Sequence, residues 1–117
     1  MSPEHQDTPA EPVLRAVSET GTVALDPSAE ELLGLLVLVD GGEGNHLVLA
    51  RVDDAQTYVQ AARNGDGRYL VEHRDGGPDR HFATVADDVG EAYRLMAEWS
   101  SGDDGWRTRV TWEQITF

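Results

Sequence analysis

The sequence contains no cysteine and no lysine. Without cysteine the chain can form no disulfide, no thiolate metal site and no cysteine nucleophile, which fits a reducing compartment. It also has no run of the roughly 18 apolar residues that a membrane span requires, and its first residues lack the charged-then-apolar pattern of a signal peptide. We therefore expect a soluble, cytoplasmic protein.

Positive charge is scarce. Nine arginines stand against 22 acidic residues, which gives a formal net charge of −13 at neutral pH. Because a negative field repels phosphates, this balance argues against nucleic acid and anionic membranes as partners. The same field would speed the approach of a basic protein, although acidity of this size can also serve solubility alone.

The length of 117 residues and the hydrophobic content of 39% suit one domain with a modest core. The opening residues, MSPEHQDTPAEP, contain three prolines and almost no apolar side chains. We expect residues 1–20 to form a largely disordered acidic tail and residues 21–117 to form a single domain. A short edge strand at residues 13–17 is the one element expected within the tail.

Helix-start residues precede the first long apolar run. Asp26 could cap a helix with the proline after it, or Ser28 and Glu31 could form a capping box. The glycine-rich segment 40–45 separates two short apolar runs, a pattern typical of a β-hairpin. We therefore predict a short helix followed by a strand at residues 35–39, rather than one longer helix.

The centre of the sequence alternates short strands with turns, and its end changes period. NGDG and DGGPD are strong turn sequences, so the strands around them should form an antiparallel meander. An apolar stripe from Val89 to Trp99 has helical spacing, and the last twelve residues alternate as a strand does. The predicted elements are a helix at 28–34, strands at 35–39, 46–52, 57–63, 68–74 and 81–85, a helix at 86–99 and a strand at 106–117.

These elements predict an α+β fold in the order α-β-β-β-β-β-α-β. It would have a six-stranded, mainly antiparallel sheet with the long helix on one face and a short N-terminal helix. In the last strand, Trp106 and Trp112 would share one face and pack against the long helix.

His73 and His81 flank the turn at residues 75–79. If this turn is a five-residue loop, the two are cross-strand neighbours and could hold zinc or copper once a carboxylate joined them. Glu72, the nearest carboxylate, points to the opposite face, and Asp75 and Asp79 in the turn could reach, but no third ligand is committed. We favour structural histidines and expect no metal or cofactor. A metal-binding or enzymatic protein that uses His73 and His81 is the alternative.

Enzymatic chemistry finds little support elsewhere in the sequence. Residues 87–91 are acidic but lack the ligand spacing of a calcium loop. The glycine turns lack the strand–glycine–helix setting of a phosphate site, and there is no GxSxG nucleophile motif. We expect a protein that is not an enzyme.

Aromatic residues beside carboxylates are instead typical of a binding surface. We expect Asp87 and Glu91 to lie one turn apart on the solvent-facing side of the long helix. The competing interpretations are a solvated helix start for the carboxylates and core packing for the aromatics. The predicted partner-binding residues are Tyr58, Asp87, Asp88, Glu91, Trp99, Asp103 and Asp104.

The order of elements over residues 22–117, with the motifs RYLVEHR, GGPDRHF, AEWSSGDDGW and VTWEQI, resembles the small immunity proteins of bacterial polymorphic-toxin systems. The resemblance implies a non-enzymatic protein that masks the active site of a toxin, and a basic toxin that attacks nucleic acid would suit an acidic inhibitor. A small acidic chaperone for a secreted substrate is the alternative. The residues that carry the resemblance are Glu72, His81, Trp99, Gly102, Trp112 and Glu113.

Overall fold

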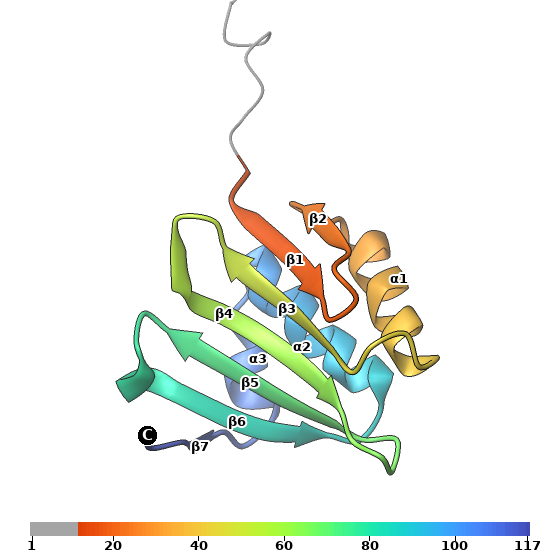
Figure 1. Cartoon of the computed structure of the whole chain (residues 1–117). Coiled ribbons are helices and arrows are strands. Elements are labelled where there is room, and N and C mark those ends of the chain that lie inside the picture. The colour runs from red at the N-terminus through yellow and green to blue at the C-terminus, as the bar shows by residue number, and fades with distance from the viewer. Residues whose placement is uncertain (1–11) are drawn as a thin grey trace, which may run out of the picture.

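The computed structural model describes residues 12–117, which form an α+β fold with its helices packed on one face of an antiparallel sheet (Figure 1). The seven strands have the order β2-β1-β3-β4-β5-β6-β7. In chain order the elements are β1 (Leu14–Ser18), β2 (Val23–Leu25), α1 (Ala29–Asp40), β3 (His46–Arg51), β4 (Asp54–Arg63), β5 (Tyr69–Asp75), the 3-10 turn η2 (Pro78–Arg80), β6 (His81–Ala86), α2 (Val89–Ser101), α3 (Gly105–Arg109) and β7 (Glu113–Gln114).

The prediction of an α+β fold with a mainly antiparallel sheet is confirmed, but its details differ. The sheet has seven strands rather than six, and two of them precede the first helix. β1 pairs with both β2 and β3, so it is an inner strand and not the predicted edge strand. β1 also lies inside the expected tail of residues 1–20, and residues 1–11 of that tail lie outside the described residues.

The predicted strand at residues 35–39 is wrong, because α1 continues to Asp40. The helix starts at the predicted capping box, in which Ser28 Oγ accepts from the Glu31 N–H at 3.1 Å and Glu31 Oε1 accepts from the Ser28 N–H at 2.9 Å. Leu32, Leu36 and Val39 are buried at helical spacing. The continuous apolar run concealed this periodicity, since apolar residues also occupy the outer face of the helix.

Two glycines test these helix assignments with opposite expected signs. Gly34 lies in the middle of α1, and a methyl group there would meet no atom within 4 Å. Gly34→Ala should therefore raise the free energy of unfolding by about 0.5–1 kcal/mol. Gly102 is equally open but ends α2 with φ +81°. Gly102→Ala should lower the free energy of unfolding by about 1 kcal/mol, because alanine is strained in this conformation. Urea unfolding followed by circular dichroism measures both, and destabilisation by Gly34→Ala would contradict the long α1.

The predicted final strand is also wrong over most of its length. Gly102 ends α2 in the left-handed conformation, and the chain then turns into the short helix α3. Trp106 of α3 is buried and meets Trp112 edge to face at 5.8 Å between ring centroids. The Trp112 Nε1–H also donates to the Trp106 carbonyl at 3.1 Å. Both tryptophans thus pack at the core, but from a short helix and an extended segment rather than from one face of a strand as predicted.

The hairpin of β5 and β6 has a different register from the predicted one. Arg74 pairs with His81 and His73 pairs with Phe82, because η2 includes Arg80 and so lengthens the loop between the strands by one residue. Neighbouring positions on a strand point to opposite faces. His73 therefore faces the helices, whereas His81 faces the other side of the sheet.

The core lies between the sheet and the helices (Figure 1). Tyr69 is fully buried in it, and its hydroxyl donates to Asp40 Oδ1 at the end of α1 at 2.9 Å. Burial and the neighbouring Asp40 both raise the pKa of the Tyr69 hydroxyl, so this donor keeps its proton throughout the ordinary pH range. The largest fully buried side chains are Tyr69, Leu32, Leu36, Leu47, Leu49, Leu95, Met96, Val39, Val59 and Val71.

Candidate functional site

A cleft of about 270 Å³ opens at one end of the sheet, between the ends of four strands and the link from α2 to α3. Three of the predicted partner-binding residues, Trp99, Asp103 and Asp104, lie on its wall. Residues distant in sequence complete it, from the start of β1, the β3–β4 turn and the end of β5. The lining residues are Val13, Leu14, Arg51, Thr57, Asp75, Trp99, Ser100, Gly102, Asp103, Asp104, Trp106 and Arg107.

The α2–α3 link is shaped by backbone hydrogen bonds that leave its carboxylates exposed. The Asp103 N–H donates to the Glu98 carbonyl at 3.1 Å, and Asp103 Oδ1 accepts from the Gly105 N–H at 2.8 Å. The side chain of Asp104 is 88% exposed, and its only ion pair among the described residues is with Arg107 at 3.5 Å. Two adjacent carboxylates are therefore held at the rim of the cleft.

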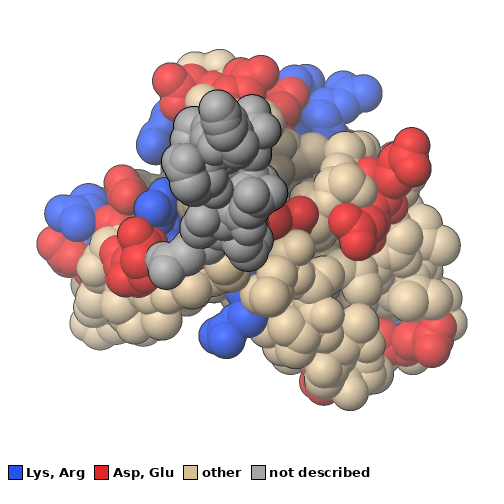
Figure 2. All heavy atoms as spheres, turned by 90° about the horizontal axis from the view of Figure 1, so that it is seen from above, with Lys and Arg blue, Asp and Glu red and all other residues tan. Residues whose placement is uncertain are grey.

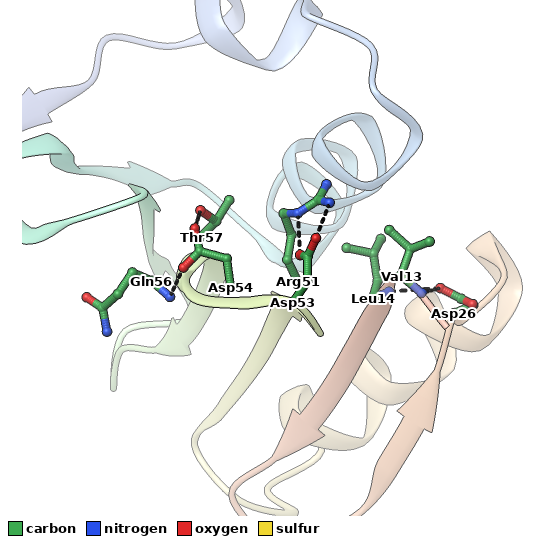
Figure 3. Close-up of polar contacts among 8 residues, drawn as sticks. All are labelled: Val13, Leu14, Asp26, Arg51, Asp53, Asp54, Gln56 and Thr57. Carbon is green, nitrogen blue, oxygen red and sulfur yellow. Dashed lines mark hydrogen bonds and ion pairs between the residues drawn. The ribbon is translucent and has the colours of Figure 1, made fainter. Parts of the chain in front are cut away.

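The opposite wall is the β3–β4 turn, where short-range polar contacts fix the backbone (Figure 3). Arg51 binds Asp53 through two hydrogen bonds of 3.0 and 3.1 Å. This guanidinium holds the pKa of Asp53 below its usual range. Asp54 accepts from the Gln56 N–H at 2.9 Å and from the Thr57 hydroxyl at 2.8 Å. These bonds tie Arg51 and Thr57, the two residues that line the cleft here, to the carboxylates of the turn.

Asp26 fixes the start of β1 at the same end of the molecule (Figure 3). Its Oδ1 accepts from the N–H groups of Val13 and Leu14 at 3.0 and 2.9 Å. Asp26 itself has φ +44°, a conformation that aspartate adopts more readily than most residues. Asp26 therefore ties down β1, while Ser28 caps α1.

The charges of the cleft are unevenly paired. Arg51 and Arg107 each contact a carboxylate of their own, Asp53 and Asp104. Asp75 and Asp103 form no ion pair within residues 12–117, although both line the cleft. Viewed from above, this end of the molecule carries several groups of acidic side chains with arginines beside some of them (Figure 2). The cleft can therefore accept a further positive charge.

The acidic residues at the start of α2 lie elsewhere, and their geometry corrects the predicted arrangement. Asp87 precedes the helix, so it does not lie one helical turn from Glu91. Asp88 is the N-cap, and its Oδ1 accepts from the Glu91 N–H at 2.8 Å. Glu91 is half-buried in a shallow hollow that Arg94 and Arg109 also line. Asp88 therefore serves as the cap of α2, and two arginines line the same hollow as Glu91.

Tyr58 lies on the sheet face that points away from the helices, in a polar network that the sequence did not reveal. The buried His81 is at its centre: its Nε2 lies 3.0 Å from Glu72 Oε1, and Arg74 Nε donates to its Nδ1 at 3.1 Å. Because a guanidinium only donates, Nδ1 accepts and Nε2 carries the proton given to Glu72. The rings of Tyr58 and Phe117 contact His81 edge to face.

This network leaves His81 no free ring nitrogen with which to take a proton from a substrate or bind a metal. His73 cannot join it around one ion, because the two histidines occupy opposite faces of the sheet. In the described part of the chain, no group of three or more histidine, aspartate or glutamate residues could hold a metal ion. The alternative that joins His73 and His81 in one site therefore has no geometric basis.

His73 lies in an aromatic box on the helix side. It stacks on Phe82 at 5.0 Å and meets Trp106 and Trp112 edge to face at 4.7 and 4.6 Å. The residue is 4% exposed. Burial, and then the positive charge of Arg107, lower the pKa of His73 to about 4. His73 is therefore a neutral part of the core at neutral pH.

The lowered pKa of His73 predicts a dependence of stability on pH. Between about pH 6.5, its value in an unfolded chain, and about pH 4, the unfolded state binds a proton that the folded state refuses. The free energy of unfolding should therefore fall by about 1–3 kcal/mol as the pH drops through this window. Urea unfolding of His73→Gln should show a shallower pH slope than that of the control His46→Gln. Equal slopes would contradict a neutral, buried His73.

Comparisons with protein-family models, with curated proteins and with solved structures find no match for this chain. Within residues 12–117, no helix is long and apolar enough to cross a membrane. A proposal for the function therefore rests on the geometry of the cleft and on the charge of the chain.

Proposed function

We propose that this chain is a non-enzymatic protein-binding domain whose cleft receives a cationic side chain of a basic protein, as an immunity-type inhibitor of a basic toxin would. The observation that carries the proposal is the convergence of Trp99, Asp103 and Asp104 on one cleft. An aromatic ring beside carboxylates is a favourable environment for a guanidinium or ammonium group, through cation–π contact and charge-assisted hydrogen bonds.

The charge balance of the cleft supports a basic partner. Its arginines, Arg51 and Arg107, are already held by carboxylates of this chain. Asp75 and Asp103 supply the charge that a partner would neutralise. The net charge of −13 would speed the approach of such a partner.

The histidines support a binding role over an enzymatic one. His81 uses both ring nitrogens in contacts with Glu72 and Arg74, and His73 is enclosed by aromatic rings. A general base or nucleophile needs a group within reach of the substrate. Both histidines are instead committed to the folded structure.

The decisive experiment tests this chain against any basic protein that is encoded beside its gene. We expect the purified pair to form a one-to-one complex in size-exclusion chromatography with light scattering, and one equivalent of this chain to abolish the toxic activity of the partner. If the neighbouring protein remains fully active in the presence of excess chain, the inhibitor role is wrong. Binding only to an unfolded partner would instead favour the chaperone.

A further inference from the structure

The outer face of α1 is apolar, which is unusual for a helix on the surface of a protein. Leu33, Val37 and Leu38 are 39%, 53% and 46% exposed, although the opposite side of the same helix already fills the core. Surface helices normally place charged and polar residues on their solvent side. A contiguous exposed apolar patch on a monomer typically marks an interaction surface.

These side chains form one surface. Leu33 and Val37 are one helical turn apart, and Gly34 and Leu38 are one turn apart on the adjoining row of the same helix. A methyl group at Gly34 would meet no atom within 4 Å, so the helix backbone is open to a neighbour at this point. In Figure 1, α1 lies at the margin of the fold, beside the edge strand β2.

Carboxylates lie near the ends of the apolar surface, and no basic residue is close to them in the sequence. Residues 21–45 contain five acidic residues and no lysine or arginine. Glu30 and Glu43 lie toward the two ends of the helix, are exposed, and have no side-chain hydrogen bond or ion pair within residues 12–117. Arg63 reaches the far end of the helix from β4, where it donates to the Asn45 side chain at 3.3 Å.

We propose that the outer face of α1 docks a basic amphipathic helix of a partner protein. Its apolar side would cover Leu33, Val37 and Leu38, and its lysines or arginines would pair with Glu30 and Glu43. Charge complementarity selects this occupant: a second copy would bring the same acidic border against itself, whereas a basic helix neutralises it. None of the residues that line the cleft belongs to α1, so this proposal stands independently of the proposed function.

The test uses a synthetic helical peptide with leucine on one face and lysine on the other. Backbone chemical shifts of the isotope-labelled full chain should change around Leu33–Leu38 when the peptide is added. Val37→Ser should weaken binding about tenfold, because a buried valine is lost from the contact. Glu30→Gln combined with Glu43→Gln should weaken binding in low salt.

Matched variants distinguish specific binding at this surface from nonspecific binding of the peptide. Val85→Ser removes an equally exposed valine from β6, and Glu113→Gln removes a carboxylate from β7, so both should bind the peptide as the wild type does. A peptide with glutamate in place of lysine should not bind. Equal losses for Val37→Ser and Val85→Ser would overturn the proposal. So would sedimentation showing a dimer that Val37→Ser dissociates, because a second copy would then be the occupant.

Discussion

Replacing Trp106 with alanine should lower the free energy of unfolding by about 3–5 kcal/mol. Trp106 is 5% exposed and contacts both His73 and Trp112, so its removal would leave a cavity between α3 and the sheet. α3 has only five residues and no side-chain cap, and a helix this short does not persist without tertiary packing. The loss is a large fraction of the roughly 5–15 kcal/mol that stabilises a typical domain.

Urea unfolding monitored by circular dichroism measures this effect. Thr108→Ala is the matched control, since Thr108 is exposed on the same helix and its loss should change stability by less than about 0.5 kcal/mol. If Trp106→Ala were as mild as Thr108→Ala, the aromatic box around His73 would not hold α3 to the sheet. The wall of the cleft would then not be fixed either.

Reversing the charge of Asp103 and Asp104 together should slow association with the basic partner by more than about tenfold and weaken its dependence on salt. Both residues are exposed at the rim of the cleft. Neither Asp103 nor Asp75 forms an ion pair within the described residues, so their negative charges are not neutralised by this chain. The double variant Asp103→Arg with Asp104→Arg should remain folded, at a cost of about 1 kcal/mol for the lost hydrogen bond from the Gly105 N–H to Asp103. Stopped-flow association kinetics at several salt concentrations provide the measurement.

The control for this variant carries the same change in net charge at a distance. Asp87 and Glu113 are exposed and lie outside the cleft, so Asp87→Arg with Glu113→Arg tests the effect of total charge alone. Asp88 is unsuitable, because its side chain caps α2 and its loss would cost about 1 kcal/mol of stability. If both double variants slow association equally, the effect is due to the net charge of the protein, and the cleft is not the binding site.

The central meander could be predicted because its turns are local. NGDG and the segment around Pro78 break the chain wherever the strands end, and those strands form β4, β5 and β6 as expected. The register of β5 and β6 could not be predicted, because η2 takes residues that the sequence assigned to an open loop. This shift by one position moved His73 and His81 to opposite faces.

The wrong predictions of strands at residues 35–39 and 106–117 have a common physical cause. The periodicity of a sequence does not show which of its residues are exposed in the fold. α1 is apolar on both sides, so its helical period disappears in an apolar run that also suits a strand. The alternation from Trp106 to Trp112 suited a strand, but burial of Trp106 beneath the sheet stabilises a turn of helix instead. Tertiary packing decided both cases.

The candidate site was predictable only where its residues are neighbours in sequence. Trp99, Asp103 and Asp104 surround the end of α2, and a helix end rich in carboxylates already indicated a surface. Arg51 and Asp75 reach the same cleft through sheet pairing that no local pattern records. Tyr58 was grouped with the others on its exposure alone, and the structure places it on the opposite face of the sheet.

Hydrogen–deuterium exchange of the complex with the basic partner tests the central claim most directly, because it maps the contact onto this chain. The account predicts slower exchange of backbone amides in the α2–α3 link around Asp103 and in the β3–β4 turn around Asp53, with little change around Tyr58. Protection confined to the sheet face that carries Tyr58 and His81, with unchanged exchange at the α2–α3 link, would contradict it.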